Sequence, residues 1–135
     1  MSQENVGVVR RALEAFNRGD LDGALDLYHP QSVVKTLLSG TACGREQLRV
    51  AIERREEEIG AVQYQPEEFI DAGEAVVGVV RVIHARGRLS GISDQDFAGA
   101  ATQLAFAWTF RDGLVFGQEM FRSRSEALEA VGLRE

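Results

Sequence analysis

Cysteine is scarce in this sequence, with a single thiol, Cys43, among 135 residues. One cysteine rules out an internal disulfide and a multi-thiolate metal centre, so we expect no metal site and no need for an oxidising compartment. Long hydrophobic runs are also missing: the longest, at residues 75–80, is too short to cross a membrane, and no N-terminal stretch resembles a signal peptide. We therefore expect a cytoplasmic protein with no membrane partner and no cofactor.

Positive charge is the second shortage. The chain has 15 Lys and Arg against 21 Asp and Glu, and its formal net charge is −6 at pH 7. Binding to phosphate backbones needs a concentrated excess of basic residues. Here the basic residues are scattered, and Arg54 and Arg55 are followed directly by glutamates at 56–58. Nucleic acid is therefore not an expected partner.

The remaining composition is that of a folded globular protein. Hydrophobic residues make up 44% of the chain and charged residues 27%, whereas disordered chains lack the apolar surface to offset their ordering entropy. A chain of this length buries one core and is too short for two ordinary ones. We expect a single domain over residues 1–135.

Helical periodicity dominates the first part of the chain. Apolar residues recur at intervals of three and four, which predicts three amphipathic helices, ended by Gly19, Pro30 and Gly60. Asp20 is the expected N-cap of the second helix. The predicted apolar stripes are Val6, Val9, Leu13 and Phe16; Leu21, Ala24, Leu25 and Tyr28; and Leu48, Ala51, Ile52 and Ile59.

Further along the chain, the spacing of the apolar residues changes from that of helices to that of strands. Strands are predicted at residues 31–38, 64–70, 75–86, 98–111 and 114–122, with turns at 39–41, 71–74 and 112–113, a loop at 87–96 and a last short helix after Ser123. In the strand at 98–111, Leu104, Phe106, Trp108 and Phe110 alternate with smaller or polar residues, and Gly117 in its partner suggests a bulge or a bend. Helices followed by long antiparallel strands indicate an α+β fold with helices packed on one face of a curved sheet.

Several short motifs resemble one family. They are AFNRGD at 15–20, LYHP at 27–30, GRE at 44–46, WTFRDG at 108–113 and EALEAVGL at 126–133. Together they extend over nearly the whole chain in family order, and the chain resembles the SnoaL-like polyketide cyclase family of the nuclear transport factor 2-like superfamily.

The resemblance implies a cone-shaped, cystatin-like roll in which a curved, mixed or antiparallel sheet wraps around the N-terminal helices and leaves one deep pocket. It also implies a small hydrophobic molecule as ligand and pairing into a homodimer. The superfamily includes isomerases, epoxide hydrolases, dehydratases, polyketide cyclases and binding or dimerisation modules, so the fold alone does not settle the function.

Three residues are candidates for catalysis. Glu119 is the first, because resembling epoxide hydrolases carry an inward acid in the last strand, and desolvation raises the pKa of a carboxylate towards neutrality. Arg81 interrupts a valine-rich strand and needs a carboxylate partner, which Glu119 could supply across the sheet. The alternatives for Arg81 are a structural ion pair and a place on an outer face used in dimer contacts. Tyr28 ends an apolar stripe with a hydroxyl that must find a partner if buried.

Further polar and aromatic residues are candidates for the pocket wall. They are Lys35, Tyr64, His84, Gln103, Trp108 and Phe121. Core packing or solvent exposure would also account for each of them. No phosphate-binding loop, nucleophile elbow or zinc-binding helix motif is present in the sequence.

Three functional hypotheses remain open from the sequence. A cofactor-free acid/base enzyme of the isomerase, cyclase, dehydratase or epoxide hydrolase type needs an inward carboxylate beside open volume. A protein that binds a hydrophobic ligand without turnover needs the volume without the carboxylate. An assembly module needs neither, because its own side chains fill the pocket.

Overall fold

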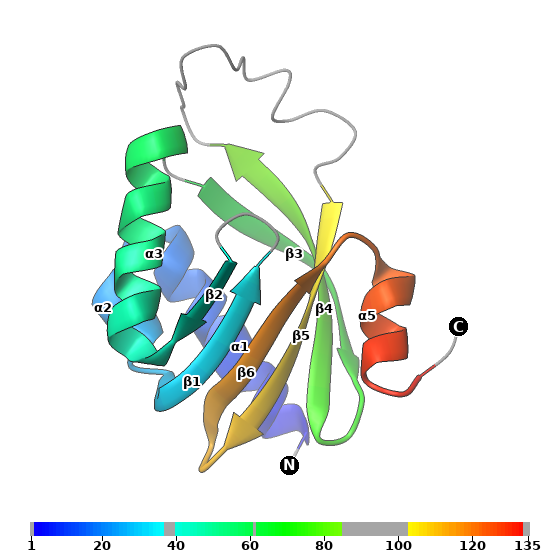
Figure 1. The fold of residues 1–135 in the computed structure, drawn as a ribbon. Helices are drawn as coiled ribbons and strands as arrows, with labels where there is room; N and C mark the ends of the chain where they lie inside the picture. The colour runs from blue at the N-terminus through cyan, green and yellow to red at the C-terminus, as the bar shows by residue number, and fades with distance from the viewer. Residues whose placement is uncertain (1, 37–39, 61, 85–102, 134–135) are drawn as a thin grey trace.

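The computed structural model describes residues 2–36, 40–60, 62–84 and 103–133, and among these it shows an α+β fold (Figure 1). The helices are α1 (Ser2–Asn17), α2 (Leu21–Leu25), α3 (Gly44–Ile59) and α5 (Arg124–Ala130). The strands are β1 (Tyr28–Thr36), β2 (Gly40–Cys43), β3 (Val62–Asp71), β4 (Ala75–His84), β5 (Gln103–Arg111) and β6 (Leu114–Phe121). The predicted loop at 87–96 and the first part of the strand at 98–111 lie outside the described residues.

The strands form one mixed sheet that is not closed. The sheet is six-stranded, in the order β2-β1-β6-β5-β4-β3. Strands β1 and β6 are parallel, and the other neighbouring strands are antiparallel. The parallel contact brings the beginning of the chain against its last strand, so the N-terminal helices and the C-terminal hairpin share one core. The predicted α+β class is confirmed.

The second helix is shorter than its apolar stripe predicts. Helix α2 ends at Leu25, and Tyr28 begins strand β1, where it pairs with Val115 of β6. Pro30 lies inside β1, and a proline pushes the residue before it towards extended backbone, which favours a strand over further helix. A second strand, β2, begins at Gly40, where the sequence predicted a turn at 39–41.

Helices cover both faces of the sheet (Figure 1). Helix α1 lies against the inner face, where Phe106 and Trp108 of β5 join Val9 and Leu13 in the main core cluster. Helix α5 lies on the outer face, where Ala127 and other small side chains pack against β4 and β5. The predicted alternation along β5 is confirmed, since its large side chains share the inner face.

A glycine in β4 makes room for the tryptophan. A Cβ added at Gly78 would lie 2.6 Å from the Trp108 ring, which is closer than any real contact. Trp108 is 2% exposed, so a larger residue at 78 would force backbone or ring movement in a closely packed region. Among the described residues, no helix is long and apolar enough to span a membrane.

Candidate functional site

A partly open cavity lies between the helices and the inner face of the sheet. Its volume is about 70 Å³. Most of its wall is apolar and comes from α1, α2, α3 and the sheet: Ala12, Leu13, Phe16, Leu21, Ala24, Leu25, Val34, Leu48, Ile52, Phe106 and Met120. The polar lining residues are Tyr28, Thr36, Arg55, Tyr64 and Gln118. An apolar wall with a few polar groups is typical of a small-molecule site.

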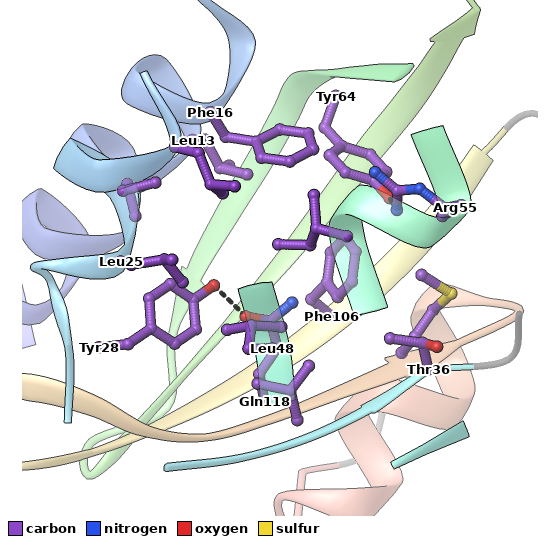
Figure 2. A pocket seen from close by; sticks show the side chains of 16 residues that line it. Leu13, Phe16, Leu25, Tyr28, Thr36, Leu48, Arg55, Tyr64, Phe106 and Gln118 are labelled. Carbon is purple, nitrogen blue, oxygen red and sulfur yellow. Dashed lines mark hydrogen bonds between the residues drawn. The ribbon is translucent and has the colours of Figure 1, made fainter. Parts of the chain in front are cut away.

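One polar end of the cavity is formed by Tyr28 and Gln118. Figure 2 shows the Tyr28 hydroxyl directed at the Gln118 side chain, and the hydroxyl donates a hydrogen bond to Gln118 Oε1. The two residues meet because β1 and β6 are neighbours, with Val34 opposite Gln118 in the register.

The hydroxyl of Tyr28 is held in its neutral form. Its phenol group is enclosed, and this burial raises the pKa of Tyr28 above its ordinary value near 10, with a smaller contribution from Tyr64. A neutral phenol donates one hydrogen bond, and this donor is already directed at Gln118. With the amide oxygen engaged in this way, the amide nitrogen of Gln118 is left as the donor for a ligand.

The other polar end is formed by Arg55 and Tyr64. Arg55 extends from α3 towards the Tyr64 ring (Figure 2), and its Nη1 donates to the Tyr64 hydroxyl at 3.0 Å. Asn17 fixes the backbone of Tyr64 with two hydrogen bonds, of 2.8 and 2.9 Å. Phe16 and Phe106 pack against the Tyr64 ring at centroid distances of 5.5 Å. The Tyr64 hydroxyl is thus held in place beside the guanidinium.

Carboxylate and imidazole side chains are missing from the described part of the cavity wall. None of its lining residues is an aspartate, a glutamate or a histidine. Among the described residues there is also no group of three or more His, Cys, Asp or Glu side chains that could hold a metal ion. The described wall can therefore bind and orient a ligand, and it provides no carboxylate to move a proton.

Two of the predicted site residues line the cavity, namely Tyr28 and Tyr64. Trp108 packs against Phe106, which lines the cavity, and the centroids of the two rings are 5.4 Å apart. It belongs to the core between β4, β5 and α1, and it does not line the cavity.

Glu119 lies on the opposite face from the cavity. It is exposed, between the inward residues Gln118 and Met120, and pairs in register with Lys35 and Ala107. The predicted inward acid is therefore wrong for this chain: strand alternation places Gln118 inward and Glu119 outward. Lys35 shares the outward orientation and is also exposed.

Arg81 takes a different partner from the predicted one. Its Nε lies 3.0 Å from Glu67 Oε2, and Gln103 donates to the other oxygen of Glu67 at 2.6 Å. The Gln103 hydrogen bond and, to a smaller extent, the Arg81 charge lower the pKa of Glu67. The three side chains form a surface cluster on the outer face, so the predicted pair of Arg81 with Glu119 is wrong.

The last two predicted residues also lie away from the described cavity wall. Phe121 packs in the outer cluster against Ala127 and Leu128 of α5. His84 ends β4, where its backbone pairs with Val62, and its side chain lies outside the described part of the structure.

Two lining residues, Arg55 and Gln118, were not predicted. Arg55 continues the helical stripe of Leu48 and Ile52 at intervals of four and three, so its periodicity already placed it on the inward side of α3. Gln118 precedes Met120 by two positions, but Gly117 interrupts the alternation on which such an assignment depends.

A larger hollow lies on the surface between the beginning of α1 and β3. Its volume is about 650 Å³, and it is open to solvent. Most of the residues around it are exposed, including Arg10, Glu67 and Glu68. Such a hollow removes little apolar surface from water, so the inner cavity is the stronger candidate for a ligand.

The fold and the cavity together define the nuclear transport factor 2-like class. Within this class, the family model of the SnoaL-like domain matches residues 9–118. The chain belongs to the SnoaL-like family. Among curated proteins no relative matches the sequence.

Solved structures agree with this assignment. A nuclear transport factor 2-like protein of unknown function from Burkholderia pseudomallei is 24% identical, with a TM-score of 0.70 over 96% of this chain and 98% of its own. TerC, co-crystallised with polyporic acid, is 20% identical, with a TM-score of 0.71 over 95% and 98% of the two chains. A protein with a ketosteroid isomerase-like fold from Catenulispora acidiphila, in complex with trimethylamine, is 19% identical, with a TM-score of 0.67 over 93% and 92%. At these identities the likeness shows the fold alone.

Proposed function

We propose that this protein binds a small, largely apolar molecule in the inner cavity between α1, α2, α3 and the sheet. The observation that carries the proposal is the wall itself, which is apolar around a volume of about 70 Å³ and has hydrogen-bonding groups at two ends. The volume argues against a pocket filled by its own side chains. The absence of a carboxylate from the described wall favours binding over acid/base catalysis.

Two similar structures contain small molecules. TerC was crystallised with polyporic acid, and the Catenulispora acidiphila protein with trimethylamine. These ligands support the use of the same fold for small-molecule binding here. The cavity has a volume of about 70 Å³. An engineered apolar cavity of about 150 Å³ holds one benzene ring, so this smaller cavity favours a compact ligand.

Fluorescence of the single tryptophan provides the test. Trp108 contacts Phe106, which lines the cavity, so binding should change its emission. We expect saturable titrations with small neutral probes such as ethanol and 2-propanol, with a Kd on the order of 1 mM.

A filled cavity is the matched control. Ala12→Leu adds volume inside the wall and should abolish binding, whereas Ala130→Leu adds the same volume at an exposed position of α5 and should leave binding unchanged. Circular dichroism checks that both variants fold. If neither probe binds, or if Ala12→Leu binds as wild type does, the cavity is not the site.

We propose homodimerisation as well, on the strength of the family resemblance. Helix α5 covers part of the outer face around Val77 and Ala107, so a second copy would contact the part that α5 leaves open. Light scattering at high protein concentration should give twice the chain mass of 14.8 kDa, and a monomer mass would refute the pairing.

A further inference from the structure

The guanidinium of Arg55 has donors that the described residues leave without a hydrogen-bond partner. One nitrogen, Nη1, donates to Tyr64, while Nε and Nη2 are buried and have no hydrogen-bond partner among the described residues. An arginine side chain stays charged at any ordinary pH and has five N–H donors. Burying such donors without acceptors is unfavourable, so a partner for them is expected.

The neighbours of Arg55 do not supply that partner. The rings of Phe16 and Tyr64 lie 5.7 and 6.0 Å from the guanidinium carbon, where they accommodate a cation but accept no strong hydrogen bond. Within the described residues, the ion pairs include none to Arg55, although Glu56 and Glu57 follow it in α3. These glutamates are exposed and lie on another side of the helix.

The Arg55 side chain that carries these nitrogens borders open space. Arg55 lines the main cavity of about 70 Å³ and also a side cavity of about 30 Å³, together with Thr36 and Leu48. Nε and Nη2 form one edge of the planar guanidinium, with their N–H bonds side by side. This edge matches the two oxygens of a carboxylate, which binds such a pair of donors through two parallel hydrogen bonds.

We propose that the natural ligand of the cavity is a small organic acid whose carboxylate binds Nε and Nη2 of Arg55, while its apolar body fills the cavity. The inference rests on the proposed function and adds the chemical class of the ligand. The Tyr64 hydroxyl, held by Nη1, keeps the guanidinium oriented. Gln118 at the other end contacts any polar group on the far side of the body.

Matched pairs of acids and amides test this inference. The probes are acetate against acetamide, and propanoate against propanamide, titrated by Trp108 fluorescence in a buffer free of other carboxylates. The members of each pair have nearly the same shape and differ in charge. We expect each acid to bind on the order of tenfold more tightly than its amide, because charge-assisted hydrogen bonds are stronger than neutral ones.

Arg55→Met removes the guanidinium and keeps an apolar chain in its place, and it should abolish the preference for the acid. Arg54→Met removes the same charge from the adjacent, exposed position and should preserve the preference. Equal binding of acid and amide to wild type, or an unchanged preference in Arg55→Met, would overturn the inference and leave the cavity as a site for neutral molecules. If no probe binds, the proposed function fails with it.

A second measurement covers the case in which Arg55→Met does not fold. The Nε–H signal of Arg55, assigned in NMR spectra with Arg55→Lys, should shift downfield on addition of propanoate and stay in place with propanamide. A signal that stays in place with both, while propanoate binds, would overturn the proposal.

Discussion

The inner and outer faces of the sheet use polar side chains in different ways. On the outer side, charged groups pair with one another at the surface, as Arg81 does with Glu67 and Arg124 with Glu68. These groups keep water as an alternative partner, so each pair contributes little to stability.

On the inner face the polar groups are few and are surrounded by apolar side chains. Tyr28 donates to Gln118, and Arg55 donates to Tyr64 while two of its nitrogens have no partner among the described residues. Water is a poorer alternative partner there, so removing a partner lowers the free energy of unfolding by more than it does at the surface. The difference shows that the few polar groups on the inner face are the candidates for ligand binding, even though most of the charged side chains lie on the outer face.

The largest expected effect comes from the inner core. Trp108→Ala removes a side chain that is 2% exposed and packed over Gly78, and it should lower the free energy of unfolding by about 3–5 kcal/mol. Thr109→Ala changes the next residue, which is exposed on the outer face, and should stay within about 0.5 kcal/mol of wild type. Urea denaturation followed by circular dichroism measures both, and similar losses would remove the distinction between the faces.

The inward hydrogen bond of Tyr28 should have the next largest effect. Tyr28→Phe leaves Gln118 without its donor and should cost about 1–2 kcal/mol at neutral pH, by urea denaturation. The pKa of Tyr28 is raised in the folded state, so above pH ~10 the unfolded chain releases this proton and the folded chain keeps it. Wild type should therefore lose stability relative to Tyr28→Phe by up to about 1.4 kcal/mol per pH unit between the ordinary and the raised pKa.

Parallel stability curves for the two proteins above pH ~10 would contradict the buried, neutral phenol. The comparison of wild type with a variant is needed because other groups also titrate in this range, and their contributions cancel in the difference.

Much of the fold could be predicted from the sequence because the signals are local. The alternation around Phe106 and Trp108 and the cap at Ser123 depend on residues within a few positions of one another, and the structure has both. The end of α2 was mispredicted because the tertiary pairing of Tyr28 with Val115 of β6 overrides the helical spacing.

The site was harder to predict, for a physical reason. Alternation tells which residues of a strand share a face, but only tertiary packing decides which face the helices enclose. Glu119 was assigned inward on family likeness, whereas its neighbour Gln118 lines the cavity. Arg55 was counted among scattered charges, although its place on the stripe of Leu48 and Ile52 pointed inward.

A smaller effect is expected from the ion pair between α5 and β3. Arg124 Nε lies 3.0 Å from Glu68 Oε1, and both side chains are more than a third exposed, at 39% and 44%. A double-mutant cycle with Arg124→Gln and Glu68→Gln should give a coupling of about 0.2–1 kcal/mol that falls in 1 M salt, because solvent ions screen exposed charges. A coupling above about 2 kcal/mol would place this outer pair on a level with the inner ones.

The smallest effect is expected at the residue that the sequence favoured for catalysis. Glu119→Gln changes an exposed side chain on the outer face and should alter the free energy of unfolding by less than about 0.5 kcal/mol. It should also leave the affinity for cavity probes unchanged, because the side chain points away from the lining residue Gln118. Gln118→Ala, at the adjacent inward position, is the matched comparison and should weaken binding of probes that accept a hydrogen bond. Fluorescence titration of both variants decides the matter: a loss of binding in Glu119→Gln that equals the loss in Gln118→Ala would mean that the face assignment of β6 is wrong.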